Sequence, residues 1–380
     1  MYIIIISTAY PLRGGIAHYN ALLASHLRQR HAVETITFKR QYPKLFFPGK
    51  TQEESGHSPQ AGMLPAPQLV DSINPFNWIR VAKEIRRRRP DLLIFKYWLP
   101  FFGPCFGTIA KLAKRGTATK ALFICDNVIP HERRPGDVML TKYAFRQADY
   151  FIVQSDAVER ELLKYFRGAT YRKTPHPVYE FFGAAISKTA AKKALQITAK
   201  NVILYFGYVR PYKGVMTLLE AMANLRDRQN EIGETLLLVV GEFYDDEQKY
   251  RQRAQELNLN ACVRLVADYI PNDQVAQYFC AADVVVLPYL SATQSGIAQI
   301  AYNFDKPVIA TDVGGLAEVV AHEKTGFLTP PDSPRDLAEA LRKFYREQRE
   351  AEFSANVKIE KRKYSWETLV RAIENLAGIA

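Results

Sequence analysis

Apolar runs rich in β-branched residues alternate with segments of helical periodicity along the whole chain. The runs favour strands, because each is short and bounded by turn-forming residues. In the first half we expect strands at 2–7, 33–39, 92–98, 121–127 and 150–155, with helices at 17–29, 76–89 and 138–146. In the second half the expected strands lie at 202–208, 235–242, 263–269, 283–289 and 307–313.

Continuously apolar strands separated by helices of ten or more residues predict parallel sheets covered on both faces. Two such series predict two doubly wound, Rossmann-like α/β domains. The boundary is expected within 173–183, where Pro175 and Pro177 interrupt regular structure, which gives domains at 1–177 and 178–364. Residues 42–68 are expected to form a long loop, and a last helix is expected to start at Ser365, a plausible N-cap.

Composition describes an ordinary globular protein of 380 residues, with 48% hydrophobic and 24% charged residues. No apolar run approaches the roughly 20 residues that span a bilayer, and the opening MYIIIIS is expected to be a strand rather than a signal sequence. The four cysteines lack metal-ligand spacing and suggest free thiols in a reducing cytoplasm.

The net charge of +12 is unevenly distributed. Residues 1–180 carry 27 Lys and Arg against 14 Asp and Glu, whereas residues 181–380 carry 24 against 25. The first half is therefore expected to bind an anionic partner: a phospholipid surface, a lipid-linked phosphate or a nucleic acid. The alternative is that the charge serves solubility alone.

The stretch YFGYVRPYKGV ends an expected strand with Arg210 and Lys213, followed by Gly214 at the start of a helix. A guanidinium can bind two phosphate oxygens and an ammonium acts as a point charge, while a helix N-terminus adds a positive field. The stretch predicts a phosphate site; the alternative is a solvated turn.

Two further loops of the second half connect a strand to a helix through small and polar residues. Gln294, Ser295 and Gly296 open one helix, and Gly314 and Gly315 precede the next. Such helix N-termini favour anions, and ligands of parallel sheets bind beyond the carboxyl ends of the strands.

The first half offers two comparable loops. Gly14 and Gly15 follow the first strand and allow close backbone approach to a ligand, although they do not form the GxGxxG dinucleotide fingerprint. Asp126 ends another expected strand, with His131 and Glu132 after it. Either Asp126 or His131 could accept a proton near neutral pH; the alternative is ordinary surface residues.

The chain resembles glycosyltransferase family 4 of the GT-B glycosyltransferases (glycosyl transferases group 1) over nearly its full length. The resemblance rests on six segments taken in order: YPLRGGIAHYN, CDNVIPHE, FGYVRPYKG, LPYLSATQSG, PVIATDVGGLAEVV and TGFLTPPD. It implies two Rossmann-like domains facing a cleft, with the last helix, 365–380, joining the N-terminal domain. It also implies an acceptor bound by the N-terminal domain, a nucleotide-sugar bound by the C-terminal domain, and transfer with retention of configuration.

The resemblance assigns roles to individual residues. Arg210 and Lys213 match the clamp on the donor pyrophosphate and would stabilise the leaving nucleoside diphosphate, and Asp126 and His131 are the candidates for acceptor chemistry. UDP- or GDP-linked sugar is the expected donor, with no metal or other cofactor required. Donor contacts are expected from Gly14, Gly15, Gly207, Glu242, Tyr269, Ile270, Gln294, Ser295 and Gly296.

Two departures from the family pattern affect this assignment. The family commonly has two glutamates eight positions apart, where this chain has Ala292 and Ile300. Many members also have a histidine where this chain has Cys125 and Asp126. Gln294, Ser295 and Gly296 would then carry more of the donor binding.

The leading hypothesis is a retaining, cytoplasmic glycosyltransferase of cell-envelope polysaccharide synthesis, acting on a glycan or lipid-linked acceptor. Residues 96–115 mix aromatic and basic side chains, which suits either a surface helix on the anionic inner face of the plasma membrane or a core helix. The alternatives are a catalytically weakened homologue that acts in binding and a sugar-nucleotide epimerase. A nucleic-acid-binding role would rest on charge alone.

Overall fold

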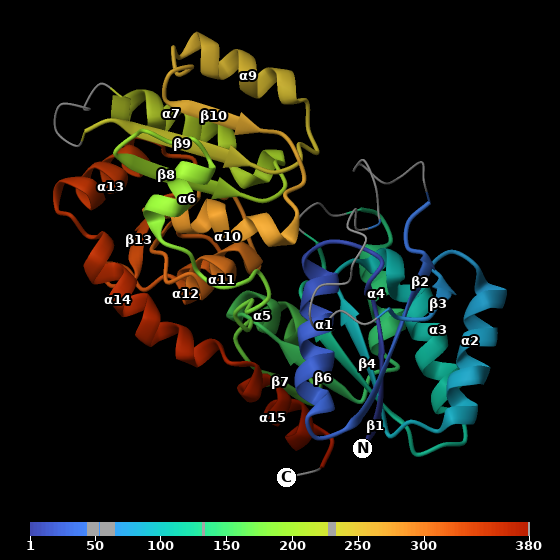
Figure 1. Cartoon of the computed structure of the whole chain (residues 1–380). Coiled ribbons are helices and arrows are strands. Elements are labelled where there is room, and N and C mark those ends of the chain that lie inside the picture. Colours follow the sequence, from blue (N-terminus) through green and yellow to red (C-terminus); the bar gives the residue numbers. More distant parts are fainter. Residues whose placement is uncertain (44–52, 54–64, 131–133, 227–232, 379–380) are drawn as a thin grey trace. The chain divides into compact units, whose positions relative to one another are not determined.

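A computed structural model describes residues 1–43, 53, 65–130, 134–226 and 233–378 (Figure 1). The chain divides into two compact units: unit 1 is Met1–Pro177 with Ser365–Ala380, and unit 2 is Val178–Tyr364. Each unit contains one parallel sheet, of seven strands in unit 1 and six in unit 2. The predicted fold class of two Rossmann-like, parallel-sheet α/β domains is confirmed.

Unit 1 has the strand order β3-β2-β1-β4-β5-β6-β7. Its strands are β1 (Tyr2–Ile6), β2 (Ala32–Arg40), β3 (Gln68–Asp71), β4 (Leu92–Tyr97), β5 (Lys120–Cys125), β6 (Tyr150–Val153) and β7 (Tyr171–Lys173). Its helices are α1 (Gly15–Arg28), α2 (Pro75–Arg88), η2 (Pro100–Phe102), α3 (Gly103–Lys114), α4 (Asp137–Phe145), α5 (Asp156–Tyr165) and α15 (Trp366–Leu376).

Unit 2 repeats this plan with the order β10-β9-β8-β11-β12-β13. Its strands are β8 (Asn201–Phe206), β9 (Thr235–Val240), β10 (Val263–Val266), β11 (Val284–Leu287), β12 (Val308–Thr311) and β13 (Gly326–Thr329). Its helices are α6 (Lys188–Ala194), η3 (Pro211–Lys213), α7 (Val215–Arg226), α9 (Glu247–Glu256), α10 (Asn272–Ala281), α11 (Gly296–Asn303), α12 (Leu316–Val319), α13 (Pro334–Arg346), α14 (Glu350–Glu360) and η4 (Lys361–Tyr364).

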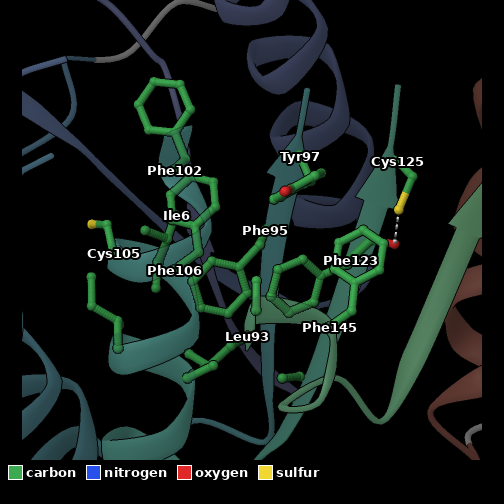
Figure 2. Close-up of a cluster of buried hydrophobic side chains, with 14 of the residues drawn as sticks. Ile6, Leu93, Phe95, Tyr97, Phe102, Cys105, Phe106, Phe123, Cys125 and Phe145 are labelled. Carbon is green, nitrogen blue, oxygen red and sulfur yellow. Dashed lines mark hydrogen bonds between the residues drawn. The ribbon is translucent and has the colours of Figure 1, made fainter. Parts of the chain in front are cut away.

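The main core of unit 1 is aromatic. Alternate residues of the central strands face α2, α3, α4 and α5, and Figure 2 shows Phe95 and Phe123 of neighbouring strands beside Phe145 of α4. The rings of Phe95 and Phe123 stack at 4.9 Å, and that of Tyr97 meets Phe145 edge-on at 4.7 Å. Side chains on the other face of these strands point toward α1, because successive residues of a strand alternate.

The C-terminal helix α15 packs against α1 of unit 1 (Figure 1). Ser365 caps it by accepting a hydrogen bond from the Thr368 N–H, as the sequence predicted. The buried Trp366 ring lies 5.1 Å from the Tyr19 ring and stacks on His26 at 5.5 Å. Residues distant in sequence thus complete one face of unit 1.

Most predicted strands and helices are present, but one segment needed the structure to decide between two interpretations. Residues 96–115 contain the end of β4, η2 and α3, and seven of the twelve residues of α3 are buried. Helix α3 therefore packs into the core, as the core-helix interpretation expected, and membrane contact by this segment stays a prediction. The expected loop at 42–68 lies largely outside the described residues, and its last residue, Gln68, is the first residue of β3.

Across the part of the chain that the structure describes, no helix has the length and apolarity needed to cross a membrane.

Replacing Trp366 with Ala is expected to destabilise unit 1 by about 3–5 kcal/mol, because a large buried ring leaves a cavity between α1 and α15. The unfolding midpoint followed by circular dichroism should fall by roughly 10 °C. Arg371→Ala is the control on the same helix, since Arg371 is 70% exposed and its ion pair with Glu367 is worth little. Equal midpoints for both variants would show that α15 does not stabilise the unit.

Candidate functional site

Two loops of unit 2 follow neighbouring strands at the point where the strand order reverses. Strands β8 and β11 are neighbours, while β9 lies on the other side of β8. The loops that follow β8 and β11 therefore run to opposite sides of the sheet, and the point where they separate is where parallel sheets bind ligands. Arg210 and Lys213 lie on the first of these loops, and Gln294, Ser295 and Gly296 lie on the second.

The turn after β8 is fixed by Gly214. Lys213 donates its N–H to the Arg210 carbonyl at 2.9 Å, and Gly214 follows with a φ of 69°. A Cβ at this position would lie 1.8 Å from the Pro288 carbonyl oxygen, so only glycine fits without backbone movement. The turn thereby packs directly against the end of β11 and brings Lys213 to it.

The Lys213 ammonium lies 3.6 Å from the centroid of the buried Tyr289 ring. Burial lowers the pKa of Lys213 to about 8, and the positive charge of Arg210 acts in the same direction. The Arg210 guanidinium lies 5.0 Å from the Tyr244 ring. Within the described residues neither cation forms an ion pair with a carboxylate, so both charges are available to an anion.

The loop after β11 ends in a capped helix. Ser295 is the N-cap of α11, and its Oγ accepts a hydrogen bond from the Ala298 N–H at 3.4 Å. The same Oγ lies 3.4 Å from the Tyr289 hydroxyl. Because Tyr289 also lies under Lys213, one tyrosine links the cationic turn to the start of α11. Gln294 is partly exposed beside Ser295.

The remaining predicted donor contacts of unit 2 lie on the neighbouring strand ends. Gly207 follows β8 with a φ of 111°, and the carbonyl of the buried Glu242, after β9, accepts the Val209 N–H at 2.9 Å. Tyr269 and Ile270 lie between β10 and α10, and Ile270 is buried. These residues line the same edge of the sheet as Lys213.

The two positions at which the family commonly has glutamates hold buried apolar residues. Ala292 and Ile300 are both buried, and a Cβ on Gly314 would lie 1.7 Å from the Ala292 carbonyl oxygen. Gln299, beside Ile300, is fully buried, and neither polar atom of its side chain has a hydrogen-bond partner in the described structure. No carboxylate replaces the missing pair on α11.

In unit 1 the strand order reverses between β1 and β4. Gly14, with a φ of 104°, is the N-cap residue of α1, and Gly15 is its first residue. The backbone carbonyl of Gly14 accepts the His18 N–H at 3.2 Å. Burial lowers the pKa of His18 to about 4, so this imidazole is neutral at pH 7.

Asp126 forms an ion pair that the sequence did not predict. Its Oδ1 lies 2.6 Å from Nζ of Lys96, a lysine of β4 that is 1% exposed. Lys96 also donates to Gln154 at 3.0 Å and lies 3.6 Å from the Tyr19 ring centroid. Burial lowers the pKa of Lys96, and the Asp126 charge opposes that shift. The sequence held a signal for this ion pair, because Lys96 interrupts the otherwise apolar run LLIFKYW and a buried lysine needs a partner.

Lys96 fixes the position of the Asp126 side chain, which is 14% exposed at the carboxyl end of β5. An ionised carboxylate can accept a hydrogen bond from a substrate hydroxyl or take its proton. His131, the other residue predicted for this role, lies outside the described residues. Among the described residues, no group of three or more His, Cys, Asp or Glu side chains could hold a metal.

Family models match most of the chain. The model for Glycosyltransferase Family 4 matches residues 13–170, and the model for Glycosyl transferases group 1 matches residues 200–347. Among curated proteins, a D-inositol 3-phosphate glycosyltransferase of Pseudarthrobacter chlorophenolicus is 33% identical over 70% of the chain, and one of Kribbella flavida is 27% identical over 63%. The matches cover 66% and 56% of those two relatives.

Solved structures share the fold over the full length. Sucrose-phosphate synthase from Thermosynechococcus elongatus has a TM-score of 0.72 at 21% identity, covering 99% of this chain and 98% of the other. Anabaena HepE in complex with UDP-glucose has a TM-score of 0.75 at 18% identity, covering 99% of each chain.

Replacing Lys96 with Met is expected to cost about 3–5 kcal/mol of folding free energy, because Asp126 then loses its partner in a mostly buried site. The double variant Lys96→Met/Asp126→Asn should recover most of that loss. Chemical denaturation measures both. Lys120→Met is the control on β5, since Lys120 is 53% exposed and 3.7 Å from its partner Asp149. A double variant no more stable than Lys96→Met would exclude a stabilising ion pair.

Proposed function

Because the chain belongs to glycosyltransferase family 4 of the GT-B glycosyltransferases, we propose that it transfers a sugar from a nucleotide-sugar to a glycan or lipid-linked acceptor. The observation that carries the proposal is the cationic turn of unit 2. Arg210 and Lys213 lie where the strand order reverses, beside a capped helix N-terminus and without a described carboxylate partner. A diphosphate fits this arrangement.

The proposed chemistry follows from where charge develops. When the bond from the sugar to the nucleoside diphosphate breaks, negative charge builds on the leaving phosphate, and Lys213 and Arg210 stabilise it. These groups are held in place by packing, so they need little reorganisation during the reaction. The proposed role of Asp126 is to accept the proton of the acceptor hydroxyl. Transfer with retention of configuration, without a metal or other cofactor, is part of the proposal.

The donor in this proposal is linked to UDP or GDP, with the base contacted by the backbone near Tyr269 and Ile270. Support for UDP comes from the HepE structures, which contain UDP and UDP-glucose. Gln294, Ser295 and Gly296 would contact the sugar and phosphate in place of the missing glutamates.

The proposed setting is cell-envelope polysaccharide synthesis at the cytoplasmic face of the plasma membrane. The positive charge of residues 1–180 supports it, because anionic lipid or a lipid-linked phosphate attracts such a surface.

A catalytically weakened homologue is the second candidate, and Ala292 and Ile300 favour it because no carboxylate stands at either position. Such a protein would bind the nucleotide without turning over the sugar. Release of free sugar or its transfer from a radiolabelled donor separates the two candidates.

Calorimetric titration with UDP and with GDP tests the donor site. One nucleotide should bind, and Lys213→Ala should weaken it by about 1.5–3 kcal/mol, tenfold or more, by removing a charge-assisted contact. Lys358→Ala is the matched control, because Lys358 is an exposed lysine of α14 in the same unit. Absence of binding by either nucleotide at millimolar concentration would contradict the proposal.

The affinity for the nucleotide is also expected to depend on pH. With its pKa lowered to about 8, Lys213 is charged below that pH and neutral above it, while the terminal phosphate, with a pKa near ~6, is fully ionised throughout. Binding should therefore weaken as the pH rises from 7 to 9.5, by at most about tenfold per unit above 8.

Lys213→Arg is the control for this dependence, since a guanidinium keeps its charge over the whole range. The variant should bind with nearly constant affinity from pH 7 to 9.5. A wild-type profile as flat as that of the variant would show that Lys213 does not supply the titrating charge.

A further inference from the structure

Exposed apolar side chains of unit 1 lie on α2 and the turn before it, on η2 and on α4. Of nine large hydrophobic side chains exposed among the described residues, six belong to this region. Phe76 is 84% exposed and Met139 is 68% exposed. Exposed apolar side chains that lie close together commonly mark a surface that binds a partner or a membrane. The six are Ile73, Phe76, Ile79, Phe101, Met139 and Tyr143.

The topology aligns these side chains along one edge. Helices α2, α3 and α4 lie side by side (Figure 1), with α3 in contact with both others. Helix α2 follows β3, η2 and α3 follow β4, and α4 follows β5. Their first turns therefore point to the same edge of the parallel sheet. Phe76, Phe101 and Met139 are the second or third residues of α2, η2 and α4, and we name these three the apolar edge.

Cations continue from the apolar edge along the outer face of α2. Arg80, Lys83 and Arg87 are exposed at helical spacing from Phe76, whereas Val81, Ala82 and Ile85 face the core. Within α2 and α3 the sequence has one acidic residue, Glu84, which pairs with Arg88. The outer stripe of α2 is thus apolar at its beginning and positive along the rest.

Helix α4 repeats the combination. A shallow depression of 530 Å³ is lined by Arg134, Lys142 and Arg146 together with Met139 and Tyr143. The one acidic residue of α4, Asp137, is buried and accepts the Arg134 N–H at 2.8 Å. No exposed acid in the described part of α4 therefore offsets these three cations.

An anionic lipid surface matches this distribution of side chains. Aromatic and aliphatic residues are stabilised at the headgroup boundary, and nearby Lys and Arg are attracted to acidic headgroups. Nucleic acid would explain the cations but not the apolar edge. A second copy of the chain would bring like charges together along α2.

We propose that unit 1 docks on an anionic membrane through the apolar edge, with the cations of α2 and α4 facing the lipid phosphates. The inference rests on the proposed function for the nature of the acceptor, which would be lipid-linked. It assigns membrane contact to the edge formed by α2, η2 and α4 and not to the buried body of α3.

Vesicle flotation tests the inference on the full chain, using vesicles of phosphatidylcholine alone and with 30% phosphatidylglycerol. The wild type should bind the anionic vesicles at least about tenfold better, and 0.5 M salt should weaken this binding. Phe76→Ser/Met139→Ser should reduce it about tenfold. Arg80→Gln/Lys83→Gln/Arg87→Gln should reduce it by roughly fivefold for each charge removed.

Matched controls carry the same kinds of change in unit 2. Ile359→Ser replaces an exposed apolar residue and Lys358→Gln an exposed cation, and both should bind vesicles like the wild type. Circular dichroism confirms that each variant is folded. Equal binding to both kinds of vesicle, or equal losses in edge and control variants, would overturn the proposal.

Two further measurements identify other occupants of the edge. Sedimentation without lipid that shows a wild-type dimer and a monomeric Phe76→Ser/Met139→Ser variant would replace the membrane by a second copy. Duplex DNA binding that depends on the α2 cations, with no vesicle binding, would replace it by nucleic acid. Nucleotide titration of the same variants should match the wild type, so failure of docking is distinguishable from failure of the donor site.

Discussion

Parallel pairing of the strands is the constraint on which both candidate sites depend. It sends every strand's carboxyl end to one edge of its sheet, and the orders β3-β2-β1-β4 and β10-β9-β8-β11 make the loops diverge at one point in each unit. Gly14 occupies that point in unit 1, and the turn from Arg210 to Gly214 occupies it in unit 2. Both loops need glycine, because Gly14 has a φ of 104° and a Cβ on Gly214 would lie 1.8 Å from the Pro288 carbonyl oxygen.

Two lysines show how similar surroundings lead to different roles. Lys96 and Lys213 each lie 3.6 Å from the centroid of a buried tyrosine ring. Lys96 also has a carboxylate at 2.6 Å, so its charge is neutralised within unit 1. Lys213 has no carboxylate partner among the described residues, and burial together with the charge of Arg210 lowers its pKa. The first lysine holds a carboxylate in place, and the second has no carboxylate to neutralise its charge.

Tyr19 connects several parts of unit 1. Its hydroxyl accepts a hydrogen bond from Gln154 at 3.0 Å, and its ring lies 5.1 Å from the rings of both His176 and Trp366. His176 and Trp366 lie next to the two places at which the chain passes between the units. Tyr19, a residue of α1, therefore contacts Lys96 of the Lys96–Asp126 pair. It also contacts one residue beside each place where the chain passes between the units.

The sequence by itself determined the fold class, most strands, several helices, the family, and the concentration of positive charge in residues 1–180, because these follow from local periodicity, motifs and composition. The short strands β3, β7 and β13 escaped prediction, since so few residues carry little periodic signal. Only the tertiary structure decided that Lys96 pairs with Asp126, that Lys213 lies over Tyr289, that α3 is buried, and that Phe76 and Met139 are exposed. These outcomes depend on which strands and helices become neighbours, and contacts between residues far apart in the chain leave no local pattern.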